Sequence, residues 1–197
     1  MRKLLVAALT LLPTTALAHP GLTHTHDLAQ SLAQGFVHPL GGLDHVLAMV
    51  AVGLLAAQLG GRALWLVPAA FVVTMAAAGA LGMTGVNIPH VETGIALSVV
   101  VLGAVVALRI GMPVGIAMAM TGGFAVFHGY AHGVEMVAGN SAASGLVYAL
   151  GFVTATAMLH GVGIAAGLMM ASVPQQLRIT QFAGGAMALA GAVLLVA

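Results

Sequence analysis

Residues 64–83 read LWLVPAAFVVTMAAAGALGM, an apolar block without a single ionisable side chain. A helix needs about 20 such residues to cross the roughly 30 Å hydrocarbon core of a bilayer. Similar apolar blocks flank it along the chain, at residues 37–59, 89–108, 112–132, 143–170 and 178–197. The breaks between the blocks are too short to form a soluble domain. The sequence therefore predicts an all-α polytopic membrane protein with six transmembrane helices.

The composition excludes several other classes of protein. The 197-residue chain is 61% hydrophobic and 5% charged, whereas an ordinary soluble domain carries about 25% charged residues. A net charge of +1 and only five Lys and Arg residues leave no basic patch, which argues against a nucleic acid partner. The absence of cysteine rules out disulfides and thiolate metal sites. The twelve methionines keep a soft Cu(I) pathway open as a weaker alternative.

Residues 1–18 have the pattern of a cleaved N-terminal signal peptide. Two basic residues precede a short apolar run, and Ala16-Leu17-Ala18 forms a small-x-small cleavage site. The apolar run is too short to span a bilayer, although a short first transmembrane helix is the alternative. Cleavage would leave His19, a candidate metal ligand, at the start of a periplasmic segment over residues 19–36. Residues 37–197 would then form the transmembrane domain.

Three arginines follow the predicted signal peptide, and they define a topology. Arg62, Arg109 and Arg178 come after the first, third and fifth apolar blocks. Alternate loops lie on one side of the membrane, and the positive-inside rule makes that side cytoplasmic. The mature N-terminus is then periplasmic, as the signal peptide independently requires, and six spans return the C-terminus to the same side. We therefore expect a multi-pass protein of the bacterial cytoplasmic (inner) membrane.

Histidine is the anomaly of this composition, since the chain has nine histidines against nine Lys, Arg, Asp and Glu residues together. Ionisable side chains within membrane spans carry a free-energy penalty and usually mark a pathway. In the predicted topology they gather at the outer ends of three blocks. They are His38, Asp44 and His45 in the first block, His90 and Glu92 in the third, and His128, His132 and Glu135 in the fourth.

His160 does not follow this pattern. It lies about 25 Å along the fifth predicted span at 1.5 Å per residue, in the inner half of the bilayer. It is either part of a metal pathway or a hydrogen-bonding partner of a neighbouring helix. Glu92 has a similar ambiguity, because a carboxylate is favourable at a helix N-terminus whether or not it binds metal.

The strongest local motif is His128-x3-His132-x2-Glu135. Residues four apart lie on one face of a helix, so two imidazoles can share one metal, with the carboxylate one further turn along. Imidazole nitrogens and carboxylate oxygens without thiolates suit Ni(II), Co(II), Zn(II) or Mn(II). The motif therefore predicts binding of a divalent transition metal.

The first block leaves two arrangements open. On a straight helix His38 and His45 lie about 10 Å apart, too far for both to bind one metal. Pro39, Gly41 and Gly42 permit a break that would bring the two rings together. Otherwise Asp44-His45 binds the metal, or Asp44 orients the imidazole, while His38 forms a separate outer station.

The stretches HPLGGLDH at residues 38–45 and FHGYAHGVE at residues 127–135 together resemble the HupE/UreJ family of nickel and cobalt permeases. The resemblance extends over nearly the whole chain. It implies uptake of Ni(II), or Co(II), as the transported substrate for hydrogenase or urease assembly, with no organic cofactor. It also implies functional roles for His38, Asp44, His45, His128, His132 and Glu135. Nickel–cobalt transporters with a His-x4-Asp-His motif form a separate family, since the spacing here is one residue longer.

Other functions remain open from the residues alone. An intramembrane Zn-dependent hydrolase would use His and Asp ligands, with Glu92 or Glu135 as the general base. A haem protein would use His pairs as axial ligands, although these histidines cluster at one end of the spans. Ser141 and Ser144 lack an adjacent His for serine protease chemistry. No Walker motif is present, so transport would be driven by the metal gradient, by trapping, or by the membrane potential.

Overall fold

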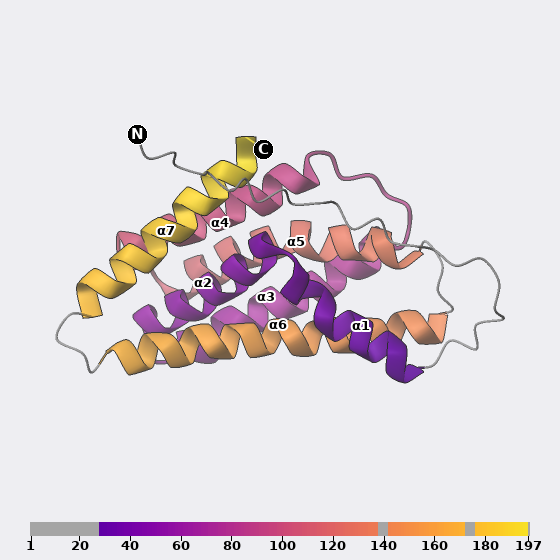
Figure 1. Ribbon diagram of the computed structural model, residues 1–197, viewed down its shortest axis with the longest axis horizontal. Helices are drawn as coiled ribbons and strands as arrows, with labels where there is room; N and C mark the ends of the chain where they lie inside the picture. Colours follow the sequence, from indigo (N-terminus) through magenta and orange to yellow (C-terminus); the bar gives the residue numbers. More distant parts are fainter. Residues whose placement is uncertain (1–27, 138–141, 172–175, 197) are drawn as a thin grey trace, which may run out of the picture.

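The computed structural model describes residues 28–137, 142–171 and 176–196, and these residues are almost entirely helical (Figure 1). The predicted signal peptide and His19 lie outside the described residues. The all-α prediction is confirmed for the part of the chain that the structure describes. Its helices are α1 (Leu28–Gly41), α2 (Leu43–Leu59), α3 (Ala63–Gly82), α4 (Val91–Ala107), α5 (Val114–Val137), α6 (Ala142–Met170) and α7 (Gln176–Val196).

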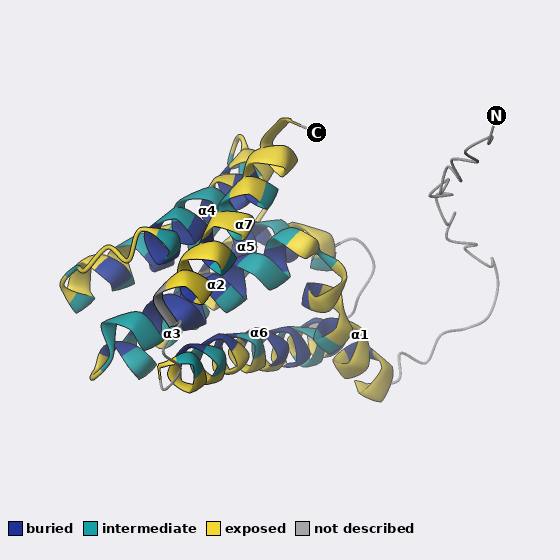
Figure 2. Cartoon of the chain, turned by 60° about the vertical axis from the view of Figure 1, so that its left-hand side comes forward, coloured by how far each residue is buried: buried dark blue, intermediate teal, exposed yellow. Residues whose placement is uncertain are grey.

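Consecutive helices from α2 to α7 run in alternating directions along the long axis of the molecule (Figure 1). The most extensive neighbours are α3 with α5, α4 with α7, and α6 with both α1 and α2. Large apolar side chains are exposed on the outside of the bundle, among them Phe182 and Leu146. Buried faces point inward and exposed faces outward (Figure 2). An apolar exterior of this kind needs lipid as its solvent, so the chain is a multi-pass membrane protein.

The helix lengths give fewer candidate membrane spans than the six apolar blocks of the sequence. Four helices, α3, α5, α6 and α7, are long and apolar enough to cross a membrane, and the bent pair of α1 and α2 adds a fifth. The apolar helix α4 has only 17 residues, which span about 25 Å at 1.5 Å per residue. It is short because its first turn follows His90, whose backbone is left-handed with φ 58°. The six-span count stays a prediction.

The first predicted span, residues 37–59, is not one continuous helix. It consists of the end of α1 and all of α2, which meet at 83°. The helices are separated by Gly42, whose backbone is extended (φ −98°, ψ 118°). A Cβ atom at this position would lie 2.7 Å from Asp44 Oδ1. A side chain at this position would therefore displace the Asp44 carboxylate from its place beside His45.

Glycines at the crossing of α3 and α5 position the helix that carries the second motif. A Cβ atom on Gly129 would overlap the backbone of Met75, and one on Gly133 would overlap the backbone of Gly79. Small residues allow this close approach in lipid, where no hydrophobic force drives helices together. The contact fixes the height and rotation of α5, and hence the positions of its histidines.

Candidate metal centre

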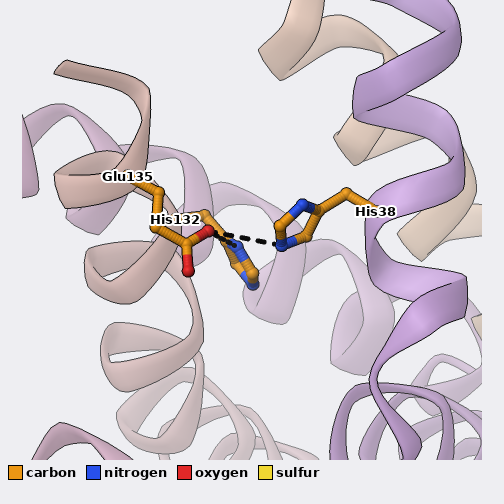
Figure 3. A group of neighbouring side chains, drawn as sticks. All are labelled: His38, His132 and Glu135. Atoms are coloured by element: carbon orange, nitrogen blue, oxygen red, sulfur yellow. Dashed lines mark hydrogen bonds and ion pairs between the residues drawn. The ribbon is translucent and has the colours of Figure 1, made fainter. Parts of the chain in front are cut away.

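Three side chains from two helices converge on one point at the exposed end of the site (Figure 3). Glu135 Oε2 on α5 lies 3.3 Å from His38 Nε2 on α1 and 3.2 Å from His132 Nδ1 on α5. The ligand atoms of these three residues all lie within 4.8 Å of one another. Two imidazole nitrogens and a carboxylate oxygen form a donor set for a divalent transition metal.

Asp44 and His45 extend this group along α2. Asp44 Oδ1 lies 2.8 Å from His45 Nδ1, and His45 Nε2 lies 2.6 Å from His132 Nε2. In a neutral ring, donation of the Nδ1 proton to Asp44 leaves Nε2 of His45 as an acceptor, so His132 donates from its Nε2. The Nδ1 of His132 then presents a lone pair toward Glu135. In this assignment Nδ1 of His132 and Oε2 of Glu135 face each other as two acceptors, an arrangement that a bound cation would stabilise.

The break at Gly42 decides between the two arrangements that the first motif left open. The ring centroids of His38 and His45 lie 4.7 Å and 4.6 Å from that of His132. Both histidines of the first motif therefore contact the same histidine of the second motif. The bend of 83° between α1 and α2 brings these rings together, as the converging alternative requires.

His128 comes one helical turn before His132 on α5, which is a rise of about 6 Å along the helix axis. Its Nε2 is 2.9 Å from Ser98 Oγ, which itself donates to the Ile95 carbonyl at 2.6 Å. Ser98 therefore accepts the Nε2 proton of His128. The Nδ1 of His128 has no hydrogen-bond partner among the described residues. The ring centroid of His128 is 4.7 Å from that of His45.

The histidines of the second motif therefore lie at two different depths along α5. The structure groups His132 with His38 and Glu135, whereas His128 is absent from that three-ligand group. The interpretation that His128 and His132 share one metal stays a prediction. Residues four apart share a face, but the axial offset between them lets each ring contact a different neighbour. We use the name histidine cluster for the connected residues His38, Asp44, His45, His128, His132 and Glu135.

The histidine cluster runs from the exterior into the interior of the bundle. The side chains of Glu135 and His38 are 56% and 39% exposed, whereas His132 and His128 are buried, with His128 at 0%. The donors therefore form a line of decreasing exposure instead of a closed sphere. Such a line can capture an ion from water and pass it into the protein.

The remaining candidate residues lie elsewhere. His90 and Glu92 are exposed and are not in the three-ligand group. Glu92 lines a pocket of about 200 Å³ together with Asp44 and the end of α7, which places one further carboxylate beside the histidine cluster. His160 on α6 is 1% exposed, and neither of its ring nitrogens has a hydrogen-bond partner in the described ranges.

Several residues of the site were not predicted from the sequence. Ser98 is a hydroxyl residue in an apolar helix, and the ring centroid of Phe152 on α6 lies 4.3 Å from that of His132, with the two rings tilted by 46°. Tyr148 lies one turn before it, with its ring 5.9 Å from that of His38. Their contribution depends on contacts between helices. The regular spacing of Tyr148, Phe152 and His160 along one face of α6 is the pattern that could have indicated them.

Fold and site together define a multi-pass membrane protein with a cluster of imidazole and carboxylate donors that enters the membrane domain. The chain matches the model of the HupE / UreJ protein family over residues 7–194, and it belongs to that family. It is 46% identical over 183 residues to Protein HupE of Rhizobium leguminosarum bv. viciae, across 92% of this chain and 94% of that protein. No solved structure matches the chain. The resemblance drawn from the two motifs is confirmed.

Proposed function

We propose that this protein transports a divalent transition metal, Ni(II) or Co(II), into the cell through the histidine cluster. The observation that carries the proposal is the continuous line of donors from the exposed Glu135 and His38 to the buried His128. Four imidazoles and two carboxylates exceed what one tetrahedral ion needs. Their arrangement at successive depths supports consecutive binding positions along a path.

The donor set also supports a choice between the metals. Affinities of nitrogen and oxygen sites rise from Co(II) to Ni(II) in the Irving–Williams order. This order alone does not set transport selectivity, since Cu(II) binds such sites more tightly still. We propose Ni(II) as the main substrate and Co(II) as the weaker one, as the resemblance of the two motifs implies, with metalloenzyme assembly, such as that of hydrogenase or urease, as the destination. Inward movement of a divalent cation gains about 4.6 kcal/mol per 100 mV of membrane potential, which is sufficient without ATP.

An intramembrane hydrolase is the less favoured alternative. A catalytic zinc site keeps three protein ligands and one open position for water, inside a cavity that admits the substrate. The three-ligand group of His38, His132 and Glu135 instead continues directly into His45 and His128 through ring contacts. We therefore assign no enzymatic activity to the site.

The proposal is tested by measuring uptake of radiolabelled nickel and cobalt in cells that express the protein, with each metal as competitor for the other. We expect saturable nickel uptake above that of the empty-vector control. Unlabelled cobalt should inhibit it only at higher concentration than unlabelled nickel does. Uptake of neither metal above the control would reject the proposal.

The positions of the arginines support a cytoplasmic assignment for one end of the bundle. The start of α3, the end of α4 and the start of α7 lie at the same end, on the left in Figure 1. Arg62 is the N-cap residue of α3, Arg109 follows α4, and Arg178 is in the first turn of α7. All three are exposed. This end is cytoplasmic by the positive-inside rule, and the exposed end of the histidine cluster is then periplasmic.

A reporter enzyme fused after residue 197 tests this topology. Since α7 starts at the arginine-bearing end, we expect a periplasm-dependent reporter to be active and a cytoplasm-dependent reporter to be inactive. A fusion in the loop that contains Arg109 is the matched control and should give the opposite pair of results. A cytoplasmic C-terminus would contradict the assignment.

A further inference from the structure

One face of α6 connects the histidine cluster to the interior. Tyr148, Phe152, Thr156 and His160 are spaced four residues apart and share that face. The first two contact the rings of His38 and His132. Thr156 Oγ1 donates to Met75 Sδ on α3 at 3.9 Å. From Phe152 to His160 the face descends about 12 Å at 1.5 Å per residue.

His160 ends this line with two ring nitrogens that have no hydrogen-bond partner in the part of the chain that is described. Its side chain is 1% exposed. A buried polar atom without a partner destabilises the fold by about 1–3 kcal/mol, so such a residue calls for an explanation. A ligand that visits the site during transport provides one. An imidazole with both nitrogens unengaged is a suitable donor for the same ion that the histidine cluster binds.

Phe71 on α3 lies between the two sets of donors. Its side chain is fully buried. Its ring centroid is 5.7 Å from that of His128 and 5.2 Å from that of His160, with the His160 ring edge-on at 84°. The Nδ1 of His128 is itself without a partner among the described residues. An apolar ring therefore separates two histidines that both have a free donor nitrogen.

We propose that His160 is a second, inner metal-binding position, and that Phe71 is the barrier that an ion must pass to reach it from the histidine cluster. This inference rests on the proposed transport function. A phenyl ring offers no ligand atom to a hydrated or partly hydrated cation, so the closed arrangement blocks passage. Movement of the ring about its side-chain torsions joins the two positions. The Phe71 ring thereby limits the flow of ions through the protein and their exchange between the two sides of the membrane.

The test uses the purified full-length protein in lipid vesicles that contain a nickel-sensitive dye. Nickel binding is measured by calorimetry and nickel influx by the dye, for Phe71→Ala, Phe71→Leu and Phe71→Trp. Phe182→Ala is the matched control, because Phe182 is 80% exposed on α7. Magnesium influx, followed with a second dye, reports whether the barrier still discriminates between ions.

We expect all three Phe71 variants to keep nickel affinity within about twofold of the unmodified protein, because Phe71 contacts His128 but has no ring contact with His38 or His132 among those of the described helices. Influx should rise at least about tenfold in Phe71→Ala, equivalent to about 1.4 kcal/mol of barrier, with magnesium admitted as well. It should fall by at least about tenfold in Phe71→Trp, whose larger ring fills the passage. Phe71→Leu keeps most of the apolar volume, so it tests the barrier even if the alanine variant does not fold. Its influx should be higher than that of the unmodified protein and lower than that of Phe71→Ala.

Two results would overturn the inference. Influx equal to that of the unmodified protein in the folded Leu and Trp variants would show that Phe71 is no barrier. A loss of nickel affinity in parallel with influx would show that Phe71 only supports the histidine cluster. Both results leave transport by the unmodified protein intact. They therefore differ from failure of the proposed function, in which the unmodified protein moves neither nickel nor cobalt.

Discussion

Replacement of His132 by alanine is expected to eliminate high-affinity nickel binding and nickel uptake together. His132 Nδ1 is 3.2 Å from Glu135 and its Nε2 is 2.6 Å from His45, so one ring joins the two halves of the histidine cluster. Mutation of a group that only orients a metal ligand lowers metal affinity by about 10–100-fold. If His132 binds the metal directly, as we propose, its loss should lower affinity by more than about 100-fold.

The measurement is calorimetric titration of nickel into the purified variant, with membrane expression and gel-filtration profile compared to those of the unmodified protein. His90→Asn is the matched control. It removes another imidazole, outside the three-ligand group, and asparagine tolerates the left-handed backbone found at His90. The control should bind nickel normally. Normal affinity in a folded His132→Ala protein would remove this residue from the site.

Replacement of His160 by glutamine or alanine is expected to separate binding from translocation. His160 lies beyond Phe71, and no direct ring contact joins it to His132 among the ring contacts of the described helices. Nickel affinity at the histidine cluster should therefore remain within about twofold. Influx into vesicles should fall by at least about tenfold, since the ion loses its inner ligand.

The glutamine variant keeps a polar side chain in the buried position and limits the cavity left by the missing ring. Calorimetry and vesicle influx are measured on the same preparation, so the two quantities are directly comparable. A large loss of affinity in a folded variant would place His160 in the capture site and end its role as a separate inner position. Unchanged influx would exclude it from the path.

Much of this architecture is readable from the sequence because the physical rules involved are local. The apolar blocks predict membrane helices, and the i, i+4 spacing of His128 and His132 predicts that both lie on one face of a helix. Pro39, Gly41 and Gly42 indicate that the first span can break, and the structure has its break at Gly42. The family assignment rests on the same two motifs and is confirmed.

The parts that the sequence does not reveal depend on contacts between helices. The partner of His128 is Ser98, 30 residues away along the chain, and nothing in an apolar helix distinguishes one serine from another. The contact between the rings of His38 and His132 depends on the 83° bend between α1 and α2, and no local pattern sets the angle of that bend. In the sequence, nothing distinguishes Phe71 from an ordinary apolar core residue. Its place between two histidines appears only when α3, α5 and α6 are packed.

The most direct test of metal transport through the histidine cluster is nickel influx into vesicles that contain only the purified protein. With an inside-negative potential, the unmodified protein should fill the vesicles with nickel at a saturable rate. His132→Ala should give no influx above protein-free vesicles, and His90→Asn should match the unmodified protein. Equal influx in the His132→Ala and unmodified proteins, or none in either despite correct folding and nickel binding, would contradict transport through this cluster.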